Sequence, residues 1–250
     1  MRLIILGAGT SIPAKGYSPA GLVVRVHDEP LLFDAGPGTI QRLSTIAGVD
    51  CFRLRHVFLT HFHLDHCADL ATLLFALRIP RPGRRQPLTV VGPRGLTRLY
   101  RRLNAAYHGW LAPRGYRVAF RETGAGVLRF PGYTVRVARM NHSTTALGYR
   151  VEQAGRSVAY SGDTDVCDAI VELGRGADAL VLECSMPDER KVAGHLTPTE
   201  CGRIAAHAGC RHLVLTHFYP VFQGYEIRRR VRRSFRGRLT LARDGLSLTL

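Results

Sequence analysis

Apolar runs of the length that crosses a membrane, about 18 residues, are absent from the 250-residue sequence. The opening MRLIILG has only four consecutive apolar residues before Gly7, which is too short for a secretory signal. The six cysteines form no C-x-x-C pair, and this argues against a zinc knuckle or a disulfide framework. We therefore expect a cytoplasmic protein without membrane attachment, whose cysteines are free thiols.

Acidic residues and lysine are also scarce. The chain has 19 Asp and Glu against 35 Lys and Arg, and the only lysines are Lys15 and Lys191. The codon usage of a GC-rich genome explains arginine in place of lysine, but it does not explain the shortage of acids. The net charge of +16 favours an anionic partner, either a small anionic substrate or RNA.

Short β-branched and apolar runs between Gly and Pro residues predict many strands, with amphipathic helices between them. The predicted strands are residues 2–6, 22–26, 31–33, 55–59, 88–91, 117–121, 134–139, 147–152, 157–160, 179–182, 212–215, 238–241 and 247–250. The predicted helices are residues 38–47, 96–107, 166–173 and 225–235, one that starts near His66, and one that starts with a Thr197–Glu200 capping box and ends near Gly209. Residues 80–87 read as a surface loop. We expect one α/β domain over residues 1–250, with stacked sheets, outer helices and two similar halves.

Four potential metal ligands crowd into the six-residue stretch HFHLDH at 61–66, directly after a predicted strand. Side chains at positions i and i+2 of an extended chain point the same way, so His61 and His63 can bind one ion. Asp65 and His66 lie where the chain turns into a helix and can reach a second ion. Imidazole and carboxylate ligands suit Zn²⁺ first, with Mn²⁺ and Fe²⁺ as alternatives.

Further ligands of a two-metal site follow other predicted strands. His142, Asp163 and His217 each come two or three residues after the end of such a strand. The stretch HLVLTHF that ends at Phe218 nearly repeats the HVFLTHF that ends at Phe62, 156 positions earlier. We interpret the repeat as one strand-plus-ligand arrangement that is used in each half, with the two copies facing each other.

With these motifs the sequence resembles the metallo-β-lactamase superfamily, and more narrowly its ribonuclease Z-like branch. The stretches that carry the resemblance are H-F-H-L-D-H at 61–66, G-T-S-x-P at 9–13, D-A-G-P-G-T-x-Q at 34–41, S-G-D-T at 161–164, L-E-C-S at 182–185, H-L-T at 195–197 and L-T-H-F at 215–218. The resemblance implies a four-layer αββα sandwich, a two-metal site and a homodimer.

The resemblance also implies roles for individual residues. One metal ion would be held by His61, His63 and His142, the other by Asp65, His66 and His217, and Asp163 would bridge the two. Glu183 and His195 would act as a pair near the leaving group, and Asp65 would also orient the nucleophile. Aspartate at position 163, where zinc β-lactamases commonly have cysteine, argues against β-lactam hydrolysis. Asp34 is expected to support a ligand histidine through a hydrogen bond.

The expected reaction is hydrolysis by a hydroxide that two metal ions activate. Members of this branch that process tRNA carry a protruding arm between the third histidine and the bridging aspartate, whereas only 20 residues separate His142 from Asp163 here. Pro37 and Leu182 also depart from the family pattern. We therefore favour a phosphodiesterase for small phosphodiesters or cyclic nucleotides. The alternatives are a ribonuclease Z-like nuclease on tRNA or other RNA, and a carboxylic ester, lactone or sulfate ester hydrolase. A non-enzymatic binding module is disfavoured.

Two groups of arginines lie outside these motifs. Residues 228–236 predict either a solvated helix or a surface that binds phosphate backbones. Arg98, Arg101 and Arg102 line a substrate entrance or form an ordinary helix face, and we favour the latter. The remaining histidines, His56 and His212 among them, are expected to have packing roles.

Overall fold

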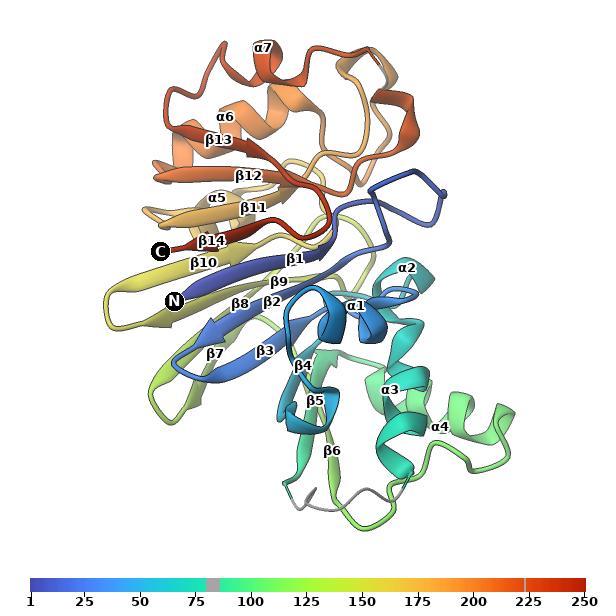
Figure 1. The fold of residues 1–250 in the computed structure, drawn as a ribbon. Helices are drawn as coiled ribbons and strands as arrows, with labels where there is room; N and C mark the ends of the chain where they lie inside the picture. The colour runs from blue at the N-terminus through green and yellow to red at the C-terminus, as the bar shows by residue number, and fades with distance from the viewer. Residues whose placement is uncertain (80–85, 223) are drawn as a thin grey trace.

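The computed structural model describes residues 1–79, 86–222 and 224–250, and two seven-stranded sheets face each other in it (Figure 1). The first sheet has the order β14-β1-β2-β3-β4-β5-β6, and the second has the order β13-β12-β11-β10-β9-β8-β7. The first sheet consists of β1 (Arg2–Gly7), β2 (Gly21–Val26), β3 (Glu29–Phe33), β4 (His56–Phe58), β5 (Leu88–Pro93), β6 (Val118–Thr123) and β14 (Ser247–Thr249). The second consists of β7 (Gly126–Phe130), β8 (Tyr133–Arg139), β9 (Leu147–Gln153), β10 (Arg156–Tyr160), β11 (Ala179–Glu183), β12 (His212–Thr216) and β13 (Arg238–Leu241).

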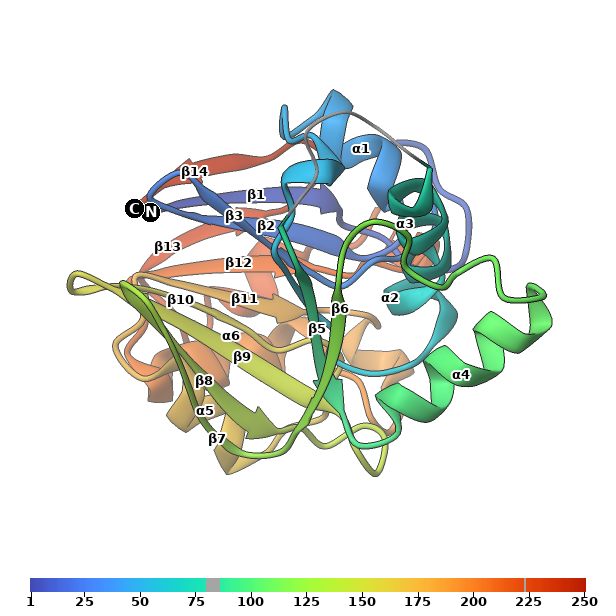
Figure 2. The same cartoon turned by 90° about the horizontal axis from the view of Figure 1, so that it is seen from below.

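Helices cover the outer face of each sheet (Figures 1 and 2). The first sheet carries α1 (Thr39–Thr45), α2 (Leu64–Cys67), α3 (Asp69–Arg78) and α4 (Leu96–Ala106), together with the 3₁₀ turn η1 (Cys51–Arg53). The second sheet carries α5 (Asp168–Gly174), α6 (Pro198–Ala208) and α7 (Ile227–Val231), with the 3₁₀ turns η2 (Asp188–Arg190) and η3 (Pro220–Phe222). The layers follow the order αββα, so the predicted four-layer sandwich is confirmed.

Three apolar clusters hold the four layers together. The central cluster lies between the sheets and joins Phe33 and Phe58 of the first sheet to Tyr149 and Val181 of the second. The rings of Phe33 and Phe58 stack with their centroids 4.8 Å apart. An outer cluster packs α3 on the first sheet, and another packs α6 on the second. Burial of apolar surface in these layers leaves the sheet edges, where polar residues gather, as the place for a site.

Most predicted elements are present, and three predictions need correction. Strand β7 was missed because it is an edge strand in which only Leu128 is buried, so its sequence lacks a strong alternating pattern. Helix α7 is much shorter than the predicted 225–235, and α5 starts at Asp168 and not at 166. The loop predicted at residues 80–87 lies mostly outside the described residues. Among the described residues, no helix is long and apolar enough to span a bilayer.

The direction of the strands sets the position of the site. Strands β3 to β6 are mutually parallel, and so are β10 to β13, so their carboxyl ends gather along one edge of each sheet. β8 runs in the same direction as β10, because both are antiparallel to β9. The two edges are in contact, since the N–H of Leu147 donates to the carbonyl of Thr60 at 2.9 Å. Polar groups from both sheets therefore meet at one place.

Candidate metal centre

The first group of predicted ligands lies in one tight turn after β4. His61 and His63 precede α2, and Asp65 and His66 belong to it. The loop after β3 contacts this turn closely, because a Cβ at Gly36 would lie only 2.0 Å from the carbonyl oxygen of Asp65. Glycine at position 36 thus allows the loop to hold the ligand turn in place.

The second group comes from three strand ends of the other sheet. His142 follows β8, Asp163 follows β10 and His217 follows β12. The backbone before Asp163 passes close to the first sheet, since a Cβ at Gly162 would lie 2.6 Å from the Cβ of Thr60. Gly162 also has φ 59°, which favours glycine. The absence of a side chain there lets Asp163 reach the ligands of the first sheet.

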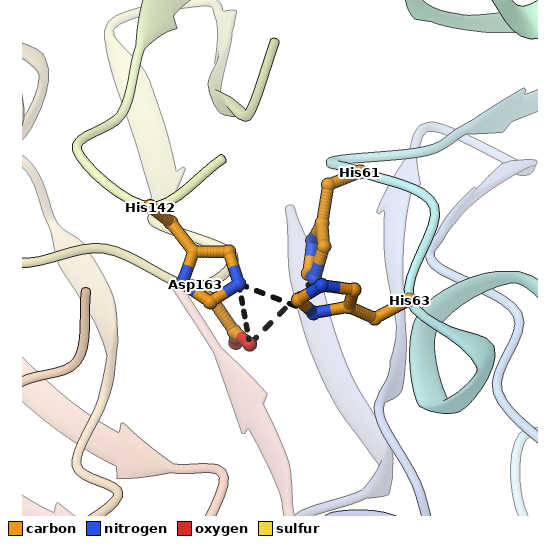
Figure 3. A group of neighbouring side chains, drawn as sticks. All are labelled: His61, His63, His142 and Asp163. Atoms are coloured by element: carbon orange, nitrogen blue, oxygen red, sulfur yellow. Dashed lines mark hydrogen bonds and ion pairs between the residues drawn. The ribbon is translucent and has the colours of Figure 1, made fainter. Parts of the chain in front are cut away.

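All seven predicted ligands come together in two groups. Candidate ligand atoms of His61, His63, His142 and Asp163 lie within 4.8 Å of one another, and their side chains converge in Figure 3. Asp65, His66 and His217 form the other group by the same measure. Asp163 connects the two groups: its Oδ2 lies 3.7 Å from His61 Nε2, and its Oδ1 lies 3.3 Å from His66 Nε2.

Hydrogen bonds around the cluster determine which ring nitrogen of His66 and His142 carries a proton. The Nδ1 of His66 lies 2.8 Å from the carboxylate of Asp34, which only accepts. The Nδ1 of His142 lies 2.8 Å from the carbonyl oxygen of Gly194, which also only accepts. Both rings donate from Nδ1, so in the neutral form each points an unprotonated Nε2 into the cluster. Asp34 thus makes the expected hydrogen bond to a predicted ligand histidine, His66.

His61 and His217 have the same arrangement through hydroxyl groups. The hydroxyl of Thr60 donates to Asp34 at 2.9 Å and accepts from His61 Nδ1 at 3.0 Å. The hydroxyl of Ser185 donates to the carboxylate of Glu183 and accepts from His217 Nδ1 at 2.9 Å. Four imidazoles therefore direct the lone pairs of their Nε2 atoms toward Asp163.

Such a set of lone pairs is stable only around positive charge. His66 Nε2 and His217 Nε2 are 3.2 Å apart, and two unprotonated nitrogens repel each other at that distance. Within the described chain, the buried atoms His61 Nε2 and Asp163 Oδ1 have no hydrogen-bond partner. Buried polar atoms without partners are costly and need an explanation. The donor set and its geometry fit divalent metal ions, which satisfy these atoms together.

In the metal-free protein, protons take part of the role of a cation. Burial lowers the pKa of His66, but the carboxylates of Asp163 and Asp34 outweigh burial and raise that pKa well above its usual value. Burial raises the pKa of Asp163, yet the positive charges of His217 and His66 hold it well below its usual range. Burial and repulsion by His66 lower the pKa of His61 to about 2. A metal ion therefore displaces protons, and its binding tightens as the pH rises.

Glu183 and His195 form the predicted pair beside the cluster. The Nδ1 of His195 donates to Glu183 at 2.9 Å, and Glu183 is fully buried. Burial lowers the pKa of His195, but the hydrogen bond and charge of Glu183 outweigh it, so the pKa is raised above its usual value. Candidate ligand atoms of His195, Asp163 and His217 also lie within 4.8 Å of one another. An imidazole that holds its proton more strongly than usual is thus placed next to the ligand groups.

Several residues of the site have no counterpart among the predictions. Thr60 and Ser185 carry the hydroxyls that orient His61 and His217, and the hydroxyl of Tyr160 donates to Asp34 at 2.8 Å. The ring of Tyr219 lies 5.9 Å from that of His217, at the edge of the cluster. A threonine stands directly before the last histidine in both copies of the HxxLTHF repeat, and this repetition could have pointed to Thr60 in the sequence. The other contacts cross between strands and leave no local pattern.

The arginines near the carboxyl end are mostly engaged with the protein itself. Arg230 pairs with Asp188 and Glu189, and Arg229 pairs with Glu226. Arg228 and Arg232 donate to backbone carbonyls. This geometry favours a structural role for the segment over a phosphate-binding surface. His56 contacts Glu29 and His212 contacts Thr240, in line with the packing roles expected for them.

A comparison with protein families identifies the chain. The beta-lactamase superfamily domain matches residues 30–218, which include every predicted ligand. The chain belongs to the beta-lactamase superfamily. Its relatives include ribonuclease Z of Streptomyces avermitilis, 30% identical over 301 residues that cover 97% of this chain and 95% of the relative. The chain is thus a metal-dependent hydrolase of the ribonuclease Z-like branch.

Solved structures agree with this assignment. Human tRNase Z, short form, has a TM-score of 0.81 at 25% identity, with 100% of this chain and 99% of that one covered. The metallo-beta-lactamase fold protein YhfI from Bacillus subtilis has a TM-score of 0.84 at 24% identity, with 99% and 98% covered. The second likeness concerns the fold alone.

Proposed function

We propose that this protein is a phosphodiesterase that uses two divalent metal ions and acts on small phosphodiesters or cyclic nucleotides. The observation that carries the proposal is the seven-residue cluster around Asp163 with the Glu183–His195 pair at its side. The ligand set suits Zn²⁺ first and Mn²⁺ or Fe²⁺ next. Phosphodiester hydrolysis needs positive charge at the phosphoryl oxygens and an acid near the leaving group, and both are provided for here.

The two ligand groups divide the ions between them. His61, His63 and His142 would hold one ion, Asp65, His66 and His217 the other, and Asp163 both. Two such ions lower the pKa of a water molecule and stabilise negative charge on a phosphoryl oxygen. The Nε2 atoms are oriented for this task by their Nδ1 hydrogen bonds, so little reorganisation is needed when the ions bind.

The protein side chains handle the protons of the reaction. When the bond between phosphorus and the leaving oxygen breaks, that oxygen gains negative charge and takes a proton from Nε2 of His195. Glu183 keeps His195 in its charged form through the hydrogen bond to Nδ1. The Oδ2 of Asp65 lies 3.4 Å from His217 Nε2, and its carboxylate orients the attacking water.

The connection between His142 and Asp163 supports a small substrate. β9 and β10 form a hairpin whose turn consists of Ala154 and Gly155, both with positive φ. No arm projects from this segment of the described chain. The alignment with the Streptomyces enzyme runs over 301 residues, more than the 250 of this chain, so the relative has segments that this chain lacks.

A second candidate function is cleavage of tRNA or other RNA. It is favoured by the relatives named ribonuclease Z, at 29–32% identity over most of the chain, and by the net charge of +16. A long RNA would need binding surface that compensates for the missing arm. The homodimer that the family resemblance implies stays a prediction.

The test is an assay of the metal-loaded protein with a panel of substrates. The panel contains a tRNA precursor, 2′,3′- and 3′,5′-cyclic nucleotides, a chromogenic phosphodiester and a lactone. We expect turnover of the phosphodiesters and none of the lactone, and the reverse result would reject the proposal. His195→Ala should lower kcat by about 100-fold or more with the metal content intact. His207→Ala, an exposed histidine on α6, is the matched control.

A further inference from the structure

A basic cavity adjoins the metal centre on the side of α4. It has a volume of about 250 Å³, and its lining includes Phe62, Arg94, Arg98, Arg102, Thr144 and Thr145. Phe62 stands between the predicted ligands His61 and His63, and the two threonines come two and three residues after His142 in the same loop. The cavity therefore opens beside the two chain segments that supply three of the predicted ligands. In Figure 2 the amino end of α4 lies near the loop that follows β8.

The geometry of Gly95 brings the arginines close to the ligand turn. Gly95 precedes α4 with φ 102°. A Cβ at this position would lie 3.6 Å from the ring of Phe62 and 3.7 Å from the guanidinium of Arg98. Arg98 thus extends over the start of the helix toward the turn that carries His61 and His63. Arg102 follows one helical turn later on the same face.

The charge of these arginines is mostly not neutralised within the protein. Among the described residues, Arg94, Arg98 and Arg102 form no ion pair and no side-chain hydrogen bond, and all three are exposed. Of the three, only Arg94 acts on an acidic group in the described chain, because its charge adds to the hydrogen bond from Thr97 in lowering the pKa of Glu122. Arginines elsewhere behave differently, as Arg150 pairs with Glu152 and Arg230 with Asp188 and Glu189. No acidic residue lines this cavity. Three like charges side by side raise the energy of the free protein and favour binding of an anion.

The basic surface continues away from the metal centre. A second cavity of about 390 Å³ shares Arg94 and Thr145 with the first and adds Arg139. Its one acidic residue, Glu122, accepts a hydrogen bond from the N–H of Thr97 at 2.9 Å, so it is engaged at the start of α4. The two cavities form a track that starts at the ligand turn.

We propose that this arginine cavity binds a second phosphate of the substrate, one that is not cleaved. Guanidinium groups bind phosphate oxygens through paired hydrogen bonds, and the threonine hydroxyls add donors beside them. The substrate is then a nucleotide or oligonucleotide with at least two phosphates, one at the metal ions and one at the arginines. This inference rests on the proposed phosphodiesterase function and narrows its substrate class. The second phosphate is either a terminal phosphate or part of an RNA backbone.

The experiment compares substrates that differ only in that phosphate. Metal-loaded protein is assayed with a diribonucleotide that has hydroxyl ends, with the same compound phosphorylated at its 5′ or 3′ end, and with a tRNA precursor. The Arg98→Ala/Arg102→Ala double variant is compared with Arg101→Ala, which removes an exposed arginine of α4 that lines neither cavity. The quantity measured is the ratio of kcat/KM between phosphorylated and unphosphorylated dinucleotide. We expect the double variant to lower this ratio by about tenfold or more, and Arg101→Ala to leave it unchanged.

A binding measurement separates failure of the cavity from failure of the proposed function. Calorimetric titration of the metal-loaded protein with dinucleotide analogues in which a methylene group replaces the leaving oxygen reports the affinity without turnover. If no diester is cleaved but the extra phosphate tightens binding through Arg98 and Arg102, the proposed function fails and the cavity assignment stands. If diesters are cleaved and neither the extra phosphate nor the double variant changes any ratio, the cavity assignment is wrong. An effect of the double variant on the tRNA precursor alone identifies the RNA backbone as the source of the phosphate. An effect on the dinucleotides alone identifies a terminal phosphate.

Discussion

The two sheets supply their candidate metal ligands in opposite ways. The first sheet places His61, His63, Asp65 and His66 within six consecutive positions after β4. The second sheet brings together His142, Asp163 and His217 from three separate strand ends. The first set is held by one turn, so it is a local feature of the chain. The second depends on the register of β8 to β12, so it forms only when that sheet has folded.

The hydrogen-bond acceptors that orient the candidate ligand histidines also differ between the two sheets. In the first sheet a single carboxylate, Asp34, accepts from His66, Thr60 and Tyr160. In the second sheet each histidine has its own acceptor, Ser185 for His217 and the Gly194 carbonyl for His142. Loss of one acceptor should therefore disturb the orientation of more side chains in the first sheet than in the second.

Asp163→Asn should have the largest effect, because Asp163 is the residue that joins both groups of ligands. We expect kcat/KM to fall by about a thousandfold, since two-metal charge stabilisation amounts to several kcal/mol. The bound metal should fall below two ions per chain by elemental analysis. Asp168→Asn, an exposed carboxylate at the start of α5, is the control and should retain metal and activity. Full metal content in Asp163→Asn would show that the two groups bind ions independently.

Metal removal should have the next largest effect, and it tests how far each sheet depends on the ions. Chelation should lower Tm by about 10 °C, as expected when bound metal ions are present at concentrations far above their Kd. Hydrogen exchange should increase more at residues 141–146 than at 64–67, because Asp65, His66 and Cys67 are buried in the described structure whereas much of the 141–146 loop is not. Equal loss of protection in both segments would contradict the distinction between a local and an assembled set.

Substitution of the supporting residues should have a moderate effect. Asp34→Asn should weaken metal binding by about 10- to 100-fold, as is usual for partners of ligand histidines. Ser185→Ala should weaken it less, because among the seven predicted ligands its hydroxyl contacts only His217, and its other histidine contact is with His195. Competitive titration with a chromogenic chelator gives both values. Tyr160→Phe removes one donor to Asp34 without a charge change and serves as the control. A larger loss of metal affinity in Ser185→Ala than in Asp34→Asn would contradict the proposal that the first sheet depends more on a single acceptor.

The smallest effect is expected at Asp165, which holds the loop behind His142. Lys191 donates to Asp165 at 2.6 Å, and Asp165 accepts from the N–H of Gly194 at 2.9 Å. Burial raises the pKa of Asp165, but these hydrogen bonds outweigh burial and lower the pKa below its usual 3.8. A carboxylate with a lowered pKa stabilises the fold above 3.8 and loses that contribution as the pH falls.

Lys191→Met should therefore lower Tm by a few degrees at neutral pH, consistent with a partly exposed ion pair. The difference from the wild type should shrink below pH 3.8, where the carboxylate becomes protonated. Thermal unfolding at several pH values is the measurement. Lys191 also pairs with Glu200 at 2.7 Å and donates to the carbonyl of His195 at 2.6 Å. A difference that stays constant down to pH 2 would mean that the lysine acts through that carbonyl and through packing, and not through the carboxylates.

Sequence patterns predicted most of the fold because most of its elements are strongly patterned. The four leucines of α3 share one face, and the capping box of α6 is present with both of its hydrogen bonds. β7 was missed because an edge strand with one buried residue has almost no pattern. The predicted helix 225–235 was too long because α7 spans only Ile227–Val231, and Arg232 just beyond it donates to backbone carbonyls in a turn.

The seven candidate ligands could be picked out from the chain, because imidazole and carboxylate groups that follow strands in this pattern point to metals, and the structure brings all seven together. The direction of each imidazole could not be read in this way. It is set by Asp34, Thr60, Ser185 and Gly194, which reach the histidines across strands and loops. The arginine cavity could not be predicted from the sequence either, because α4 and the loop after His142 are distant in the chain. Ligand chemistry is a property of single residues, whereas orientation and shared space depend on which segments the folded sheets bring together.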